Sequence, residues 1–426
     1  MRSIITVTST AGLLLGSFVP AQARKHHHSH PHWVHPSYST PNTSTLHATG
    51  SASSGFDSAP TGFVPAPLSS TSTPIVYTSV LPVSAPSPSA PSPSVYTSSS
   101  SIFTSSSSPS AAAAAPTPSK SISSESALGY AIAASWDATN FFDNFKFFTD
   151  TDPTSGFVKY VDETTAKSDG LAKYQNNQVY LGVDTSSKDA SSGRDSVRLE
   201  SKTAFNNGLL IGDFEHMPGG ACGIWPAFWV INNDGNLPYT EIDIVEGVAL
   251  QDHDDISMYT GPACTMAVRN AAELGTSPNF DCNLDDGGCH ITGPTGTFGD
   301  SFNSHKGGVW ALQVESDGIR IWQFPRDSIP SDITSGNPDP STWSAAILDW
   351  QPASCDMSTA FASMTTVFNI DLCGSNYGDG AWGGEDWTGC YASTKVGTCE
   401  AYVRDNPTAF TDAYFLINSV KWYQKA

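Results

Sequence analysis

The chain has 426 residues and a formal net charge of −21 at pH 7, from 41 Asp and Glu against 20 Lys and Arg. Residues 1–127 carry 4 basic and 2 acidic side chains (net +2), whereas residues 128–426 carry 16 basic and 39 acidic ones (net −23). Because so acidic a domain repels nucleic acid and anionic membranes, we expect neither as a partner and expect an uncharged one. For the charge alone, the simpler explanation is that acidity keeps an exported protein soluble at low pH.

Residues 1–23 read as a signal peptide. A basic start at Arg2 is followed by the apolar run Ala11-Gly-Leu-Leu-Leu-Gly16 and by Ala21-Gln-Ala23, a small-x-small cleavage pattern. No later stretch approaches the roughly 20 apolar residues of a membrane helix. We therefore expect a secreted protein, extracellular or associated with the cell wall.

Residues 24–127 are predicted to form a disordered stalk, rich in His at first and then in Ser, Thr and Pro. Too few apolar side chains are present to offset the entropy of ordering the chain, and the composition is typical of O-glycosylated segments. Six histidines lie between His26 and His35. They could bind metal or titrate near neutral pH, but a solvated polar tail is the simpler interpretation.

Residues 128–426 are predicted to form one all-β catalytic domain: a two-sheet antiparallel jelly-roll sandwich with a concave substrate cleft. Short β-rich runs alternate with Gly, Pro, Asp and Asn, and long amphipathic helices are nearly absent. The clearest hairpin spans 309–324, with Asp317-Gly318 at the turn and Pro325 after the second strand. Further strands are predicted at 196–201, 227–231, 256–259, 365–371 and 415–423.

The eight cysteines all lie in this domain. An even number in an exported protein favours disulfides over metal or thiol chemistry, although eight cysteines allow about 105 pairings. We predict only one of them, Cys282 with Cys289, which closes a polar loop. The domain is expected to be a monomer.

The most informative run is Thr240-Glu-Ile-Asp-Ile-Val-Glu-Gly247. On a strand, Glu241 and Asp243 share a face, and Glu246 joins them only if a bulge absorbs one extra residue near Ile244 and Val245. Three acids on one face repel one another, so chemistry is the best reason to keep them. Two carboxyl groups of unequal pKa are what glycoside hydrolysis requires.

Aromatic residues lie close to the acids in the sequence. The strand that includes Trp225 and Trp229 is predicted to lie beside the acid strand, where these rings could stack on sugars. Four other tryptophans are assigned to the core: Trp310, Trp322, Trp350 and Trp422.

Several blocks together resemble the fungal laminarinase branch of glycoside hydrolase family 16, in order and over nearly all of residues 130–426. They are Asp152-Pro-Thr-Ser-Gly-Phe-Val-Lys-Tyr160, Gly193-Arg-Asp-Ser-Val-Arg198, Cys222-Gly-Ile-Trp-Pro-Ala-Phe-Trp229, Glu241-Ile-Asp-Ile-Val-Glu-Gly247, Phe324-Pro-Arg-Asp-Ser-Ile-Pro330, Pro338-Asp-Pro-Ser-Thr-Trp343 and Leu372-Cys-Gly374.

The resemblance implies a retaining endo-β-1,3(4)-glucanase that acts on β-glucan and needs no organic cofactor. In the family's Glu-x-Asp-x-x-Glu pattern, Glu241 would be the nucleophile and Glu246 the acid/base, with Asp243 hydrogen-bonded to Glu241 between them. Retention requires the two glutamate carboxyl groups to lie about 5–5.5 Å apart. Arg198, from the second block, is a further substrate-binding candidate.

The chain also departs from the family. Gly247-Val-Ala249 replaces the usual Gly-Val-Asn, and Tyr259 stands where the next strand usually has His, which suggests an altered pH profile or leaving-group preference. The stretch from Cys373 to Trp382 is longer than usual, and Trp382 is taken as a stacking candidate beside the alternative of an ordinary loop tryptophan.

Rival interpretations stay open. A wall-remodelling transglycosylase would use the same acids, a non-catalytic β-glucan-binding module would need only the aromatic cleft, and a structural wall glycoprotein would explain only the stalk. Two acidic stretches, 252–255 and 281–286, are candidate structural calcium sites without a known loop spacing.

Overall fold

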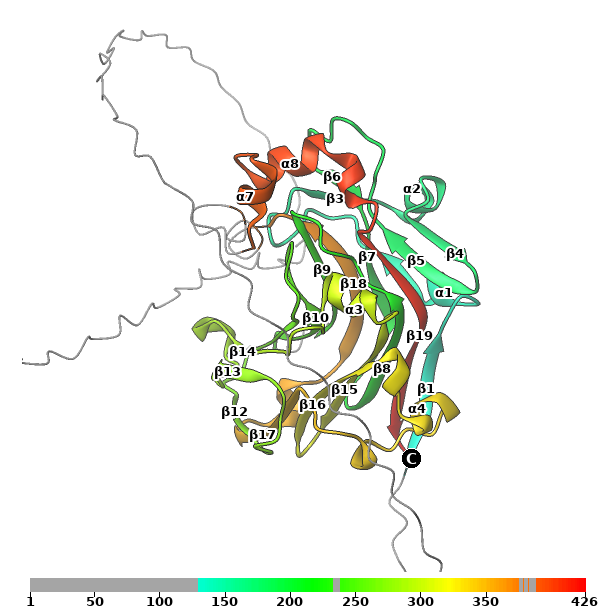
Figure 1. The fold of residues 1–426 in the computed structure, drawn as a ribbon. Coiled ribbons are helices and arrows are strands. Elements are labelled where there is room, and N and C mark those ends of the chain that lie inside the picture. The colour runs from blue at the N-terminus through cyan, green and yellow to red at the C-terminus, as the bar shows by residue number, and fades with distance from the viewer. Residues whose placement is uncertain (1–128, 233–237, 375–377, 379–381, 383–387) are drawn as a thin grey trace, which may run out of the picture. The chain divides into compact units, whose positions relative to one another are not determined.

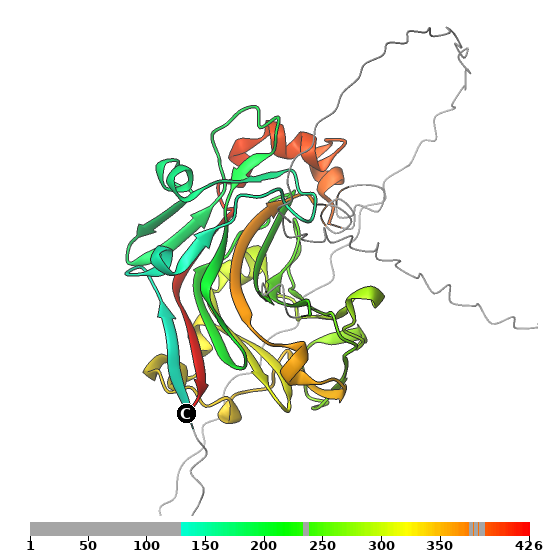
Figure 2. The same cartoon turned by 180° about the vertical axis from the view of Figure 1, so that it is seen from behind.

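The computed structural model describes residues 129–232, 238–374, 378, 382 and 388–426. The expected signal peptide and stalk lie outside the described residues. The described part is a sandwich of two curved antiparallel sheets packed face to face (Figure 1), and the view from behind shows the same curvature (Figure 2). The predicted fold class is confirmed.

The larger sheet forms one layer of the sandwich. Its strands follow the order β12 (Thr265–Val268), β17 (Leu348–Ser354), β16 (Gly318–Pro325), β15 (Gly308–Glu315), β8 (Gly208–His216), β19 (Tyr414–Lys425), β5 (Gln178–Gly182) and β4 (Ala172–Gln175), and β1 (Tyr130–Trp136) also pairs with β19.

The second sheet carries the acid strand. Its order is β13 (Thr276–Asn279), β14 (Cys289–Thr292), β11 (Asp255–Thr260), β10 (Thr240–Glu246), β9 (Ile224–Asn232), β18 (Met364–Leu372), β7 (Arg198–Phe205) and β2 (Phe145–Phe147). A small parallel pair joins β3 (Val158–Tyr160) and β6 (Arg194–Ser196). Each strand predicted from the sequence lies within one of these elements or spans two consecutive ones.

The predicted hairpin is present as β15 and β16, which pair from Gly308 with Pro325 to Glu315 with Gly318. Gly318 has a φ of +145°, and a β-carbon there would lie 2.0 Å from the carbonyl oxygen of Trp350. Only glycine fits this turn, because an L side chain would be both strained and blocked by backbone.

Aromatic side chains fill the space between the two sheets. Phe214 from the larger sheet packs against Phe228 and Phe368 from the second, and the Phe228 and Phe368 rings stack at 4.8 Å. Of the four tryptophans assigned to the core, Trp310, Trp350 and Trp422 belong to this main core and Trp322 to a second apolar cluster, and each is at most 4% exposed. This packing fixes which face of β9, β10 and β18 points away from the core.

Helical segments are short throughout the described residues. They are α1 (Phe141–Asn144), α2 (Glu163–Ser168), α3 (Gly299–Ser304), α4 (Ser331–Ser335), α5 (Met357–Ala360), α7 (Cys390–Thr394) and α8 (Cys399–Asp405), with the 3₁₀ turns η1 (Leu284–Asp286), η2 (Arg326–Ser328), η3 (Pro340–Thr342) and η4 (Pro407–Phe410). None of the described helices has the length and apolar character needed to span a membrane.

Four disulfides staple the sandwich, and the predicted Cys282–Cys289 bridge is confirmed. Cys264–Cys355 joins the regions around β12 and β17. Cys222–Cys390 and Cys373–Cys399 connect the start of β9 and the end of β18 to the segment containing α7 and α8. The last two bridges anchor this segment at the end of the second sheet where Trp225 lies.

Candidate active site

The acid strand β10 contains the bulge that the sequence predicted. Its pairing with β9 places Glu241 opposite Ile231 and Asp243 opposite Trp229, then shifts by one residue so that Glu246 lies opposite Ala227. Ile244 and Val245 are both buried in the core at the shift. The extra residue therefore brings Glu246 back to the face that carries Glu241 and Asp243.

We call this face, which points away from the other sheet, the acid face. Its apolar floor is a small cluster separate from the main core, consisting of Ala227, Trp229, Ile231 and Val367, with Tyr239 packed against it. Glu241 and Glu246 are partly exposed there, while Asp243 is 4% exposed. Both glutamates can thus meet a ligand from solvent, and Asp243 lies beneath them.

Glu241 is hydrogen-bonded by one tyrosine, faces a second across the strand pair, and feels the charge of an arginine. The hydroxyl of Tyr239 donates a hydrogen bond to Glu241 Oε2, and Tyr259 on β11 lies directly opposite Glu241. Burial raises the pKa of Glu241 to about 7, while the Tyr239 hydrogen bond and the charge of Arg198 act in the opposite direction. Both groups therefore favour the ionised carboxylate.

Glu246 is held through its side chain and its backbone. The indole Nε1 of Trp225 donates a 2.8 Å hydrogen bond to Glu246 Oε1, and the Glu246 amide donates one of 2.8 Å to Asp254 Oδ1. Burial raises the pKa of Glu246 to about 8, the Trp225 hydrogen bond opposes this, and the charges of Glu241 and Asp255 add to it. The two glutamates differ in what opposes the effect of burial: Glu241 has the charge of Arg198 and a phenol donor, and Glu246 has a neutral indole donor.

Asp243 differs from the expectation in one respect. Burial, followed by the charges of Glu241, Glu246 and Asp254, raises its pKa well above the usual range. Within the described residues its side chain makes no hydrogen bond to Glu241 or Glu246. Asp243 therefore influences the pair through its charge or its proton, rather than through the expected hydrogen bond to Glu241.

Arg198 and Trp229 lie next to each other on the acid face but have little free surface. The Arg198 guanidinium lies over the Trp229 ring at 5.0 Å and over Phe148 at 4.4 Å, and it pairs with Glu200 Oε1 at 3.0 Å. Trp229 Nε1 donates a 2.7 Å hydrogen bond to Asn369 Oδ1. At 8% and 7% exposure, Arg198 and Trp229 form the floor of the site.

The two remaining tryptophan candidates are also enclosed. Trp225 is 6% exposed and acts on Glu246 as a hydrogen-bond donor. Trp382 is 2% exposed, its indole donates a 3.0 Å hydrogen bond to the Val396 carbonyl, and its ring packs 5.1 Å from that of Tyr402. These contacts are those of a packed loop tryptophan, the alternative given for Trp382, and its stacking on sugar stays a prediction.

The candidate calcium stretches show no metal-binding arrangement. In the described ranges, no three His, Cys, Asp or Glu side chains gather as ligands. Asp254 is buried with its Oδ1 on the Glu246 amide, and Asp255 accepts hydrogen bonds from Gln251 and Thr292. Asn283, in the second stretch, caps the turn η1 and bonds Asp286 at 3.0 Å.

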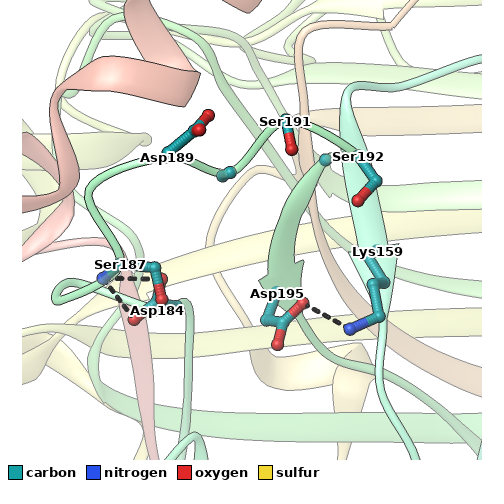
Figure 3. Close-up of a pocket in the computed structure, with 9 residues that line it drawn as sticks. Lys159, Asp184, Ser187, Asp189, Ser191, Ser192 and Asp195 are labelled. Carbon is teal, nitrogen blue, oxygen red and sulfur yellow. Dashed lines mark hydrogen bonds and ion pairs between the residues drawn. The ribbon is translucent and has the colours of Figure 1, made fainter.

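Figure 3 shows a polar cavity of about 140 Å³ whose lining includes Lys159, Asp184 and Asp195. Its lining comes from β3, β6 and the loop that precedes β6, and includes the ion pair between Lys159 and Asp195 at 3.1 Å. None of its lining residues belongs to β9, β10 or β18, so it is separate from the acid face.

Three residues that contact the acid pair or its floor were not predicted from the sequence. Tyr239 stands two positions before Glu241, a spacing that puts both on one strand face and could have identified it. Asn369 lies on β18, and Asp254 directly precedes β11. Their contacts with the site depend on the register between strands. No local pattern marks them.

The chain is similar in sequence to proteins of known family. A family model described as XgeA-like, catalytic GH16 domain, matches residues 145–423. An endo-1,3(4)-β-glucanase of Arthroderma benhamiae is 38% identical over 303 residues, which are 70% of this chain and 65% of that protein. A probable glycosidase of Schizosaccharomyces pombe is 38% identical over 310 residues, 71% of each chain. The chain thus spans slightly under two thirds of the Arthroderma relative.

Two solved structures share the fold. An elongating GH family 16 β-1,3-glucosyltransferase is 35% identical, with a TM-score of 0.63 over 69% of this chain and 100% of that one. Laminarinase 16A from Phanerochaete chrysosporium, solved with two β-glucans in donor and acceptor sites, is 30% identical, with a TM-score of 0.62 over 69% and 99%.

Proposed function

The chain belongs to glycoside hydrolase family 16, and from this membership and its acid strand we propose that residues 129–426 form a retaining endo-β-1,3-glucanase that also cuts mixed β-1,3/1,4-glucan. One observation carries the proposal: the bulge in β10 puts Glu241 and Glu246 on the same face, each partly exposed and each held by a hydrogen-bond donor. A family member that had lost catalysis would have no need for this arrangement.

The environments of the two glutamates support different roles. Glu241 is stabilised as a carboxylate by Tyr239 and Arg198, as a nucleophile must be, and its attack on the anomeric carbon would form a covalent glycosyl-enzyme. Glu246, whose pKa is raised by burial and by the charge of Glu241, would protonate the departing glycosidic oxygen. Once Glu241 is esterified its charge is gone, so Glu246 loses its proton more readily and can activate water.

The names of the relatives support β-glucan as the substrate class. The Arthroderma relative is an endo-1,3(4)-β-glucanase, and the Phanerochaete structure holds β-glucans in donor and acceptor sites. A neutral polysaccharide also fits the charge of a domain that carries a net −23. We propose further that the protein acts outside the cell or in the cell wall, as its N-terminal sequence suggests, and as a monomer.

Transglycosylation is the second candidate, because the elongating β-1,3-glucosyltransferase is 35% identical over its whole chain. Both reactions proceed through the same glycosyl-enzyme. They differ in whether water or a sugar hydroxyl takes the glycosyl group from Glu241.

Product analysis separates these outcomes. The protein and its Glu241→Gln variant would be incubated with laminarin, lichenan and cellulose, and products would be followed by chromatography and by the anomeric proton signals of the first products. New shorter chains of β configuration from laminarin, absent with the variant, are expected. Longer products alone would identify a transferase, α-configured first products would exclude retention, and no change with any glucan would leave a binding module.

A further inference from the structure

Tyr239 is placed to act on the nucleophile directly. It stands two residues before Glu241, so both side chains lie on the acid face, and its ring packs against the floor formed by Ala227, Trp229, Ile231 and Val367. Its hydroxyl donates a hydrogen bond to Glu241 Oε2. The ring is therefore fixed by packing, and the hydroxyl is aimed at one oxygen of the carboxylate.

The phenol can act only as a donor in this place. Burial raises the pKa of Tyr239 well above 10, and the charge of Glu241, the hydrogen bond to Glu241 and the charge of Asp243 raise it further. Tyr239 keeps its proton through the pH range in which glutamates titrate, so the hydrogen bond runs from Tyr239 to Glu241 and favours the ionised acid.

Other groups near Glu241 do not duplicate this contact. Arg198 lowers the pKa of Glu241 through its charge, but its guanidinium is engaged with Glu200 and the rings of Phe148 and Trp229. Tyr259 lies opposite Glu241, but within the described residues Tyr239 supplies the side-chain hydrogen bond that Glu241 accepts. The two oxygens of Glu241 are thus inequivalent, with Oε2 engaged by Tyr239.

We propose that Tyr239 is a positioning residue that holds Glu241 Oε2 and leaves Oε1 as the attacking oxygen, an inference that rests on the proposed function. In the first step an electron pair on Oε1 forms the bond to the anomeric carbon, the glycosidic C–O bond breaks, and the departing oxygen takes the proton of Glu246. Oε2 becomes the ester carbonyl oxygen and accepts the same hydrogen bond, so Tyr239 keeps its proton throughout. In the second step Glu246 takes a proton from a water molecule, the water oxygen bonds to the anomeric carbon, and the bond from that carbon to Oε1 breaks, which restores the Glu241 carboxylate.

The test compares wild type, Tyr239→Phe and a variant with 3-fluorotyrosine at position 239. The first readout is the rate at which a 2-fluoro-laminaribiosyl fluoride labels Glu241, measured against pH by mass spectrometry. Loss of a hydrogen bond to a charged group predicts about a tenfold to hundredfold slower labelling in Tyr239→Phe. In Tyr239→Phe the acidic limb of the labelling rate against pH should move to higher pH. In the fluorotyrosine variant, whose phenol is a stronger donor, that limb should move to lower pH.

The second readout is the carboxyl titration of Glu241, followed by NMR with ¹³C-labelled glutamate. This titration needs no turnover, so it decides the role of Tyr239 even if the protein cleaves no β-glucan. Failure to cleave any β-glucan would contradict the proposed function but not the role of Tyr239. Tyr239→Phe should raise the pKa of Glu241. Tyr180→Phe, on β5 of the other sheet, is the matched control and should leave both readouts unchanged.

Two results would overturn the inference. One is an unchanged Glu241 titration in Tyr239→Phe. The other is labelling that is slower by the same factor at every pH, with the acidic limb of the profile unmoved in both Tyr239→Phe and the fluorotyrosine variant. That result would mean that Tyr239 contributes packing alone. If Tyr239→Phe does not fold, the fluorotyrosine variant keeps the ring and the donor, and the direction of its shift decides.

Discussion

The backbone amide of Glu246 is hydrogen-bonded to the carboxyl group of Asp254 at 2.8 Å, so a residue outside β10 fixes the position of the candidate acid/base. Asp254 is fully buried, and its second oxygen, Oδ2, has no hydrogen-bond partner among the residues that the structure describes. Burial raises its pKa well above the usual range, although the hydrogen bond from Glu246 opposes the shift. A neutral carboxyl group is the form that this place favours.

Asp254→Asn is therefore expected to fold and to retain activity. A raised folded-state pKa gives stability that is complete below the unfolded pKa and is lost as pH rises toward the folded one. Asn is neutral at every pH and escapes this loss. The variant should match wild type near pH 4 and exceed it near pH 7 by about 1–3 kcal/mol in the free energy of unfolding, measured with urea.

Two comparisons sharpen that measurement. Asp327→Asn, on the exposed turn η2, should show no such pH-dependent gain. Asp254→Ala removes the acceptor of the Glu246 amide and should lower both stability and activity. A wild-type-like Asp254→Ala would show that the contact does not position Glu246.

Replacement of the two glutamates should separate their roles. Glu246→Ala removes the proton donor, and activity on laminarin should fall by about a hundredfold to ten-thousandfold, with less loss on substrates whose leaving group needs no protonation. Added azide should then intercept the glycosyl-enzyme and give a β-glycosyl azide. With Glu241→Ala, azide should attack in place of the missing nucleophile and give an α-glycosyl azide.

NMR of the azide products checks this assignment. Asp213→Ala, in the other sheet, is a control that should give no azide product. The same azide anomer from both glutamate variants would be inconsistent with the assigned roles.

The pH dependence of kcat/KM should reflect the raised pKa values of the pair. Activity requires ionised Glu241 and protonated Glu246, whose pKa values are raised to about 7 and about 8. The profile should be a bell whose acidic limb lies well above the 4.5 of an ordinary Glu, and its apparent values belong to the coupled pair. Initial rates on laminarin from pH 3 to 10 measure it, and an acidic limb at or below pH 4.5 would contradict the prediction.

Tyr259→His should move that profile toward lower pH. Burial and the charges of Glu246, Asp243 and Glu241 keep the Tyr259 phenol neutral. An imidazole among the same acids would bind a proton, and the resulting positive charge would lower the pKa of Glu241 and Glu246. Tyr259→Phe adds no charge and serves as the control. A Tyr259→His profile that coincides with that of Tyr259→Phe would rule out this electrostatic effect.

The disulfides should differ in their contribution to stability. In the chain-entropy account, a bridge stabilises more when it closes a longer loop. Cys222–Cys390 spans 168 residues and Cys282–Cys289 spans 7. Replacement of both cysteines by Ser should lower the free energy of unfolding by at most about 5 kcal/mol for Cys222–Cys390 and about 2 kcal/mol for Cys282–Cys289. The first value is an upper one because the other bridges already shorten the larger loop. Urea unfolding of the two double variants measures the order, and a reversed order would contradict the account.

The sequence by itself determined the fold class, the hairpin turn at Gly318, the bridge between Cys282 and Cys289, and the bulge in β10. Each depends on a local rule: alternation of side chains along a strand, the conformational freedom of glycine, or short loop closure. The bulge followed from spacing alone, because three acids can share a strand face only if one extra residue is absorbed between Asp243 and Glu246.

The tertiary structure decided what surrounds the acids. Trp225, expected to stack on sugar, donates a hydrogen bond to Glu246, and Trp382 is packed inside the protein. Asp254, which directly precedes the neighbouring strand β11, accepts a hydrogen bond from the Glu246 amide. Such contacts depend on register between strands and on burial, which set both the geometry and the pKa of each carboxyl group. Neither quantity is a property of a residue and its immediate sequence neighbours.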